Sequence, residues 1–149
     1  MKFEKFLKGC GTHGQVLEMS NGDTWLICAG VGMKVPVGVT NLLGSGEVGE
    51  KTKKIVEAIV KADTGDKVFL KRAVVEKGGK SRDIIQIFGD MNDIEVGIYN
   101  DNFGLLEKSD YNLTEVEIEA DDFRTETKYL LILTPGDEVI GFIQGVKDI

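Results

Sequence analysis

The sequence predicts a β-hairpin between Gln15 and Cys28, where it reads QVLEMSNGDTWLIC. Two apolar runs, Val16-Leu17 and Trp25-Leu26-Ile27, flank the turn Ser20-Asn21-Gly22-Asp23. Asn-Gly between apolar runs is the strongest short-range hairpin signal and favours a type I′ turn, in which both central residues take φ > 0. The stretch indicates the fold class, because later segments show the same pattern of apolar ribbons joined by polar turns.

The second strand of this hairpin is expected to continue through Ala29 to Pro36, where proline cannot donate to a strand ladder. Gly30 and Gly32 interrupt it and indicate a bulge or a close backbone approach. Residues 37–46 read as a glycine-rich connector.

Six later segments have the composition or alternation of strands, and two further hairpin turns lie among them at Lys77-Gly78-Gly79-Lys80 and Pro135-Gly136-Asp137-Glu138. The segment Lys128–Thr134 is almost entirely apolar, so we expect it in the middle of a sheet. The strand segments are 67–76, 84–88, 94–99, 116–118, 128–134 and 139–146.

Two helices are expected. Phe3, Phe6 and Leu7 have helical spacing, which predicts a short helix over residues 2–8 that stops at Gly9. A long helix is predicted from Glu47 to Ala62, because apolar side chains line one face and lysines the other. The fold class is therefore α+β: a single β-rich domain over residues 1–149, with a mainly antiparallel sheet or a barrel-like arrangement of several hairpins and one long helix packed on it.

Composition restricts the classes of function. The chain has 18 basic and 25 acidic residues and a net charge of −7, which disfavours binding to nucleic acid. No apolar run reaches the ~20 residues that span a bilayer, and the charged N-terminus is unlike a signal peptide. These features predict a cytoplasmic protein. Positive charge gathers between Lys51 and Arg82 and acid dominates after Asp90, an asymmetry that fits complementary faces on neighbouring subunits and equally a solvated surface.

Cys10 and Cys28 are the two cysteines of the chain, 18 positions apart. In a cytoplasmic protein we expect two reduced thiols, and a disulfide or redox pair is the alternative. Cys10 also lies three residues before His13, the single histidine, so a hydrolase built on a Cys10–His13 pair is a third-ranked hypothesis. These three residues form too small a ligand set for a zinc motif.

The loop 44–52 reads GSGEVGEKT and opens the long helix as a phosphate-binding loop would. A P-loop requires lysine directly after the last glycine, and here Glu50 intervenes. We therefore expect a connector and a helix start. The alternative is a small-ligand or nucleotide site formed by Gly44, Gly46, Gly49, Lys51 and Thr52.

Two other sets of residues suggest sites, and a solvated surface is the simpler expectation for both. Acidic groups could hold a divalent cation, although no EF-hand frame fits them and the alternating Glu115, Glu117 and Glu119 are expected to face solvent. Aromatic and basic residues could stack bases, although Phe69 and Phe88 are expected in the core. The acidic set is Asp90, Asn92, Asp93, Glu95, Asp101, Glu115, Glu117, Glu119, Asp121 and Asp122, and the second set is Phe69, Lys71, Arg72, Arg82 and Phe88.

The stretches Gly9–Gly14 and Trp25–Met33 resemble small uncharacterised proteins encoded by bacteriophages and prophages. They cover about a fifth of the chain, and no functional residue carries over from the resemblance. The resemblance implies a phage-encoded protein and a virion component.

The sequence thus predicts a non-enzymatic structural or assembly protein, a phage virion accessory subunit that contacts copies of itself and other assembly proteins. No catalytic residue, metal ligand or cofactor is predicted, and neither a membrane nor nucleic acid is expected as a partner. The alternative is the small-ligand or nucleotide-binding module at loop 44–52.

Overall fold

The computed structural model describes residues 1–39, 46–62, 65–78, 81–92, 94–120 and 125–146. Its helices are α1 (Phe3–Cys10), α2 (Glu50–Lys61) and α3 (Asn100–Phe103), with a 3₁₀ turn at Gly11–His13. Its strands are β1 (Gln15–Glu18), β2 (Thr24–Cys28), β3 (Val31–Lys34), β4 (Gly46–Glu47), β5 (Phe69–Gly78), β6 (Ser81–Gly89), β7 (Glu95–Tyr99), β8 (Leu113–Ala120), β9 (Thr125–Leu133) and β10 (Val139–Gln144).

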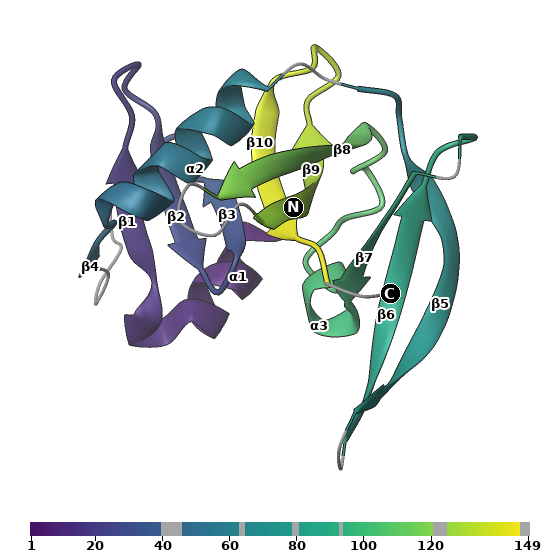
Figure 1. Ribbon diagram of the computed structural model, residues 1–149. Coiled ribbons are helices and arrows are strands. Elements are labelled where there is room, and N and C mark those ends of the chain that lie inside the picture. The colour runs from purple at the N-terminus through teal and green to yellow at the C-terminus, as the bar shows by residue number, and fades with distance from the viewer. Residues whose placement is uncertain (40–45, 63–64, 79–80, 93, 121–124, 147–149) are drawn as a thin grey trace.

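The strands form two sheets, so the β-rich α+β class is confirmed (Figure 1). One sheet has seven strands in the order β4-β1-β2-β3-β10-β9-β8, and the other has three in the order β5-β6-β7. All pairs are antiparallel except β1 with β4. The barrel-like alternative is wrong for the described residues, because β4 and β8 stand at opposite edges and the β5–β7 meander forms a separate sheet.

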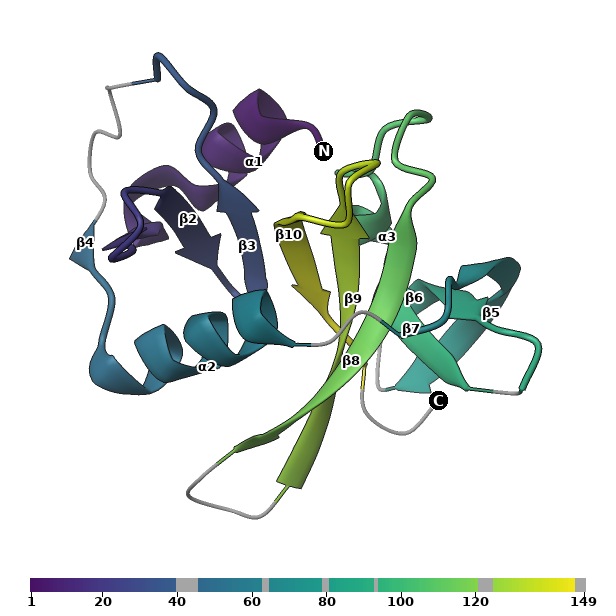
Figure 2. The same ribbon diagram turned by 90° about the horizontal axis from the view of Figure 1, so that it is seen from above.

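Alternating side chains give the large sheet two apolar faces, and both are covered. Trp25, Leu131 and Phe142 point to one face and pack with Val56 and Ile59 of α2. The residues adjacent to them along the same strands, Leu26, Leu130 and Ile143, point to the other face. Figure 2 shows α1 and α2 on opposite sides of the strands.

The small sheet shares the core of that second face. Phe88, Val96 and Ile98 belong to the same buried cluster as Leu130 and Ile132 of β9. Backbone bonds join the parts as well, since Val146 N–H donates to Gly97 O at 2.7 Å and Val68 N–H donates to Leu113 O at 3.0 Å. The expectation that the apolar segment 128–134 lies inside a sheet is confirmed, because β9 runs between β10 and β8.

The hairpin that the sequence predicts at Asn21-Gly22 is present, but its turn is not of type I′. Among described non-glycine residues only Ala29 and Asp137 have positive φ, so Asn21 does not. Gly22 has φ 92°, its N–H donates to Met19 O at 3.0 Å, and Met19 N–H donates to Asp23 O at 2.8 Å. This is the three-residue loop in which a type I turn precedes a left-handed glycine.

The second strand does not run on to Pro36 as expected. Ala29 and Gly30, with φ 50° and 79°, form a two-residue turn that separates β2 from β3 and pairs Cys28 with Val31. Positive φ at alanine is sterically unfavourable, so Gly30 is the one residue of this turn whose preference marks it in the sequence.

The prediction of one long helix over residues 47–62 is wrong, because the observed helix is shorter. The helix α2 has 12 residues and is one of three short α-helices in the described parts of the chain. Gly46 and Glu47 instead pair in parallel with Gln15 and Val16, and Gly49 precedes the helix with an extended backbone. No helix in the described residues is long and apolar enough to cross a membrane. The shorter helix α1 passes Gly9 and ends at Cys10.

Candidate functional site

The strand β5 forms an open edge of the small sheet. One side of β5 pairs with β6, and no described strand pairs with the other side. Three apolar side chains on β5 are at least half exposed to solvent: Phe69 at 59%, Leu70 at 50% and Val75 at 55%. Figure 1 shows the β5–β6 hairpin extending away from the rest of the molecule. Ten residues of edge strand with exposed apolar groups make a template for pairing with another chain.

The strand β8 forms the second open edge, at the end of the large sheet. Its inner side pairs with β9 over all eight residues. On its outer side, Lys67 pairs with Thr114, and no described strand continues the pairing beyond Thr114. Glu117 and Glu119 along this strand are exposed. This edge therefore presents backbone hydrogen-bonding groups together with carboxylates.

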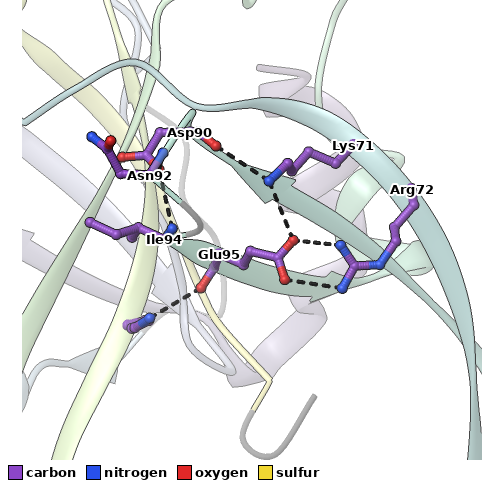
Figure 3. A network of polar contacts seen from close by, with 7 residues as sticks. Lys71, Arg72, Asp90, Asn92, Ile94 and Glu95 are labelled. Carbon is purple, nitrogen blue, oxygen red and sulfur yellow. Dashed lines mark hydrogen bonds and ion pairs between the residues drawn. The ribbon is translucent and has the colours of Figure 1, made fainter.

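Basic side chains on β5 surround one carboxylate, Glu95 of β7 (Figure 3). The Arg72 guanidinium donates to both Glu95 carboxylate oxygens, at 2.5 and 3.0 Å, and Lys71 Nζ lies 3.7 Å from Glu95 Oε2. The two hydrogen bonds from Arg72 hold the pKa of Glu95 below its usual range. Lys71 Nζ also donates to Asp90 O at 3.3 Å. The network fixes β5 against β7 across the sheet.

The two open edges carry opposite charge. Lys67, Lys71 and Arg72 lie at or just before the start of β5, and in the described part of the chain Lys71 and Arg72 share the carboxylate of Glu95. Glu115, Glu117 and Glu119 lie along β8, where the register sets Lys128 opposite Glu117. In the described part of the chain, basic side chains therefore lie near one open edge and acidic side chains along the other.

Glu115 differs from the expectation that the alternating glutamates face solvent. The side chain is half-buried, and Glu115 Oε2 has no hydrogen-bond partner. Burial raises the pKa of Glu115, Glu117 and Asp90 raise it further, and Lys128 opposes the shift. Glu115 follows Thr114, the β8 residue that pairs with Lys67, and lies near Asp90 and Lys128, whereas Glu117 and Glu119 lie farther along the strand and are exposed. The spacing alone could not distinguish them.

A cavity of about 320 Å³ lies beside the first turn of α2. Its polar lining includes His13, Gln15, Thr52 and Gln144, and Cys28, Tyr129 and Phe142 also border it. A volume of this size is near the lower end for small-molecule sites. The sequence predicts Thr52 in the alternative ligand site at loop 44–52. It gives no signal for Gln144 or Tyr129, which come from the C-terminal part of the chain.

The residues of loop 44–52 are dispersed over three local structures. Gly46 lies in β4 and its N–H donates to Gly14 O at 3.1 Å, while Gly49 accepts the first helical bond from Lys53 N–H. Lys51 and Thr52 lie in the first turn of α2, and Thr52 alone of the candidate set lines the cavity. Gly44 lies outside the described residues. The Gly46 N–H is thus engaged within the protein instead of facing a phosphate.

Cys10 and His13 occupy different environments. Cys10 is 2% exposed within the core, and burial raises the pKa of its thiol to about 12, with Cys28 contributing further. A nucleophilic cysteine requires the opposite shift, because the thiolate is the reactive form. His13 is exposed and lines the cavity, where the neighbouring thiol is Cys28.

The remaining candidate sets are not brought together as sites. The described residues contain no group of three or more His, Cys, Asp or Glu side chains that could hold a metal ion, and Asp93, Asp121 and Asp122 lie outside them. Phe88 is buried, as expected, whereas the expectation of a buried Phe69 is wrong. The side chain of Arg82 also lies outside the described residues.

No protein-family model, curated protein or solved structure matches this chain.

Proposed function

We propose that this protein is a non-enzymatic assembly subunit whose copies associate by strand pairing, with the β5 edge of one copy against the β8 edge of the next. The main support for this proposal is the open β5 edge, where the side chains of Phe69, Leu70 and Val75 are at least half exposed. The resemblance to phage-encoded proteins implies that this assembly is a virion and that other virion proteins are further partners. The site of action would be the host cytoplasm until assembly.

Charge supports the choice of a second copy as the partner. Among the described residues, the basic groups near the start of β5 outnumber the carboxylate of Glu95 that pairs with them, and the glutamates of β8 outnumber Lys128. Edge-to-edge pairing would satisfy backbone groups on both strands and cover Val75 from water. Because the two edges are different surfaces, the contact is head-to-tail and produces a ring or a filament rather than a closed dimer.

Light scattering across a wide concentration range tests the proposal. We expect the mass to rise above that of one chain with concentration, and to fall again near 1 M salt, where the Debye length is about 3 Å. Val75→Lys places a charge on the exposed β5 edge and should keep the protein monomeric. Ala58→Lys adds the same charge on the exposed face of α2, away from both edges, and is the matched control.

A third variant tests the partner edge. Glu119→Lys reverses an exposed charge on β8 at a position whose register partner is Glu126, so the new lysine does not face another cation. Loss of association in both edge variants, with Ala58→Lys unaffected, supports head-to-tail pairing. A wild-type protein that stays monomeric at all concentrations contradicts the assembly function. Association that survives Glu119→Lys but not Val75→Lys contradicts the role of β8.

The cavity favours a second candidate, a small-ligand or nucleotide-binding module. Thr52 at the start of α2 lines this 320 Å³ space together with His13 and Gln144. A thermal-shift screen against nucleotides and other small polar ligands tests it, since any ligand above its dissociation constant raises the melting temperature. Stabilisation that disappears in Thr52→Val supports this function, and no shift at millimolar ligand rejects it.

A further inference from the structure

The two cysteines of the chain meet in the folded protein. Cys10 is the last residue of α1 and Cys28 is the last residue of β2; both belong to one apolar cluster, and Cys28 is close enough to contribute to the raised pKa of Cys10. Both are free thiols in this structure. Nothing in their spacing of 18 residues requires this contact, which arises because α1 covers the face of the sheet to which Cys28 belongs.

The two thiols differ in their access to solvent. Cys10 is 2% exposed and lies in the buried cluster with Phe6 and Leu26. Cys28 is only half-buried and borders the cavity beside α2, together with His13 and Gln144. A small reagent in solvent therefore has access to the half-buried Cys28, whereas Cys10 is almost completely shielded.

We propose that Cys28 and Cys10 form a reversible thiol–disulfide site in which Cys28 reacts with a low-molecular-weight disulfide and Cys10 resolves the product. In the first step the Cys28 thiolate attacks one sulfur of the reagent, the reagent S–S bond breaks, and one reagent thiolate leaves. In the second step Cys10 loses its proton to solvent and attacks Cys28 Sγ, which releases the second reagent thiolate. Two protein thiols are oxidised, and one reagent disulfide is reduced to two thiols.

The environment of Cys10 sets the order and the rates of these steps. Burial raises the pKa of its thiol to about 12, so Cys10 is almost fully protonated at neutral pH. Exchange requires the thiolate, which makes the second step slower than the first. The mixed disulfide on Cys28 should consequently accumulate near pH 7 and convert to the Cys10–Cys28 disulfide faster as the pH is raised.

The disulfide would stabilise the fold by joining α1 to the sheet. It closes a loop of 18 residues, which restricts the unfolded chain. For a chain of this length we expect the melting temperature to rise by about 5–10 °C. The effect is reversible, because a reducing thiol such as dithiothreitol restores both cysteines and the lower melting temperature.

The test uses the full chain with oxidised glutathione as the probe. Intact mass should show first a glutathione adduct and then a species lighter than the reduced protein by two hydrogen atoms. Peptide mapping should place the adduct on Cys28 and the final bond between Cys10 and Cys28. Cys10→Ser should stop at the adduct, and Cys28→Ser should form neither species, because its remaining thiol is buried.

Alkylation of the native wild-type protein provides a measurement that does not depend on how the variants fold. Iodoacetamide should modify Cys28 at least tenfold faster than Cys10, a ratio that follows from access and protonation. The proposal is overturned if Cys10 is modified first, if oxidised glutathione links two chains instead of the two cysteines of one chain, or if the adduct on Cys28 persists at pH 9. These readouts do not involve self-association through β5 and β8, so the two proposals fail independently.

Discussion

The ring of Phe142 in β10 lies against the backbone of Gly32, its register partner in β3. A Cβ atom at position 32 would overlap the Phe142 ring. The same ring stacks on Trp25 with centroids 5.8 Å apart and meets the edge of Tyr129, also at 5.8 Å. Because Gly32 has no side chain, the Phe142 ring of the aromatic cluster under α2 occupies the space that a Cβ atom would fill.

Gly32→Ala should destabilise the fold, because the added methyl group forces Phe142 out of its position. We expect a loss of about 1–3 kcal/mol in the free energy of unfolding. The control is Gly9→Ala, since Gly9 lies inside α1 with nothing within 4 Å of a Cβ atom and should gain roughly 0.5–1 kcal/mol. Urea unfolding followed by Trp25 fluorescence measures both changes, and equal stabilities for the two variants would contradict the close approach.

Glu115→Gln should stabilise the protein at neutral pH. Burial raises the pKa of Glu115, so the folded state favours the protonated form. Stability from this group is complete below its unfolded pKa of about 4.3 and is lost as the pH rises through the folded value. The gain from glutamine should therefore be present at pH 7 and vanish below about pH 4. Glu119→Gln, at an exposed position of the same strand, is the control and should change the free energy of unfolding at pH 7 by less than Glu115→Gln.

Arg72→Met should raise the pKa of Glu95 toward its ordinary value. The bidentate bonds from Arg72 are the largest cause of the lowered pKa, and Lys71 adds a smaller contribution that the variant retains. The stability linked to Glu95 is present above the ordinary carboxyl pKa and declines as the pH falls through the lowered value. Carbon NMR titration of the Glu95 carboxyl measures the shift. Arg72→Lys should give an intermediate pKa, and identical titrations in all three proteins would rule out the pairing.

Asn112→Asp should destabilise the protein more than Asn112→Ala at pH 7. Asn112 is 5% exposed, and its Nδ2 donates to Thr134 O at 2.6 Å and to Asp137 Oδ1 at 2.9 Å. Alanine loses these bonds at a cost of about 1–3 kcal/mol, whereas aspartate also places a buried carboxylate against two oxygen acceptors. Thermal unfolding at pH 7 and pH 4 measures the difference. It should shrink at the lower pH, where the aspartate binds a proton, and a constant difference would refute the contact.

Local patterns were sufficient for the elements that depend on neighbours in sequence. The hairpin around Gly22, the apolar strand 128–134 and the helix in 50–61 all follow from turn residues and apolar periodicity. The turn at Ala29-Gly30 did not, because alanine has no preference for positive φ and adopts it here only within the paired strands β2 and β3. The helix α2 begins later than Glu47 because Gly46 and Glu47 pair with Gln15 and Val16 of β1, 31 positions earlier in the chain.

The sequence by itself determined a β-rich α+β protein with short polar turns and an uneven charge distribution, because these properties depend on residue type and on spacings of two to four residues. Only the tertiary structure decided that β5 and β8 are open edges, that Glu115 is covered while Glu119 is exposed, and that Cys10 meets Cys28. Each of these depends on which distant strand or helix packs against the residue. Many long-range pairings satisfy the same apolar pattern, and the burial of the whole core selects among them.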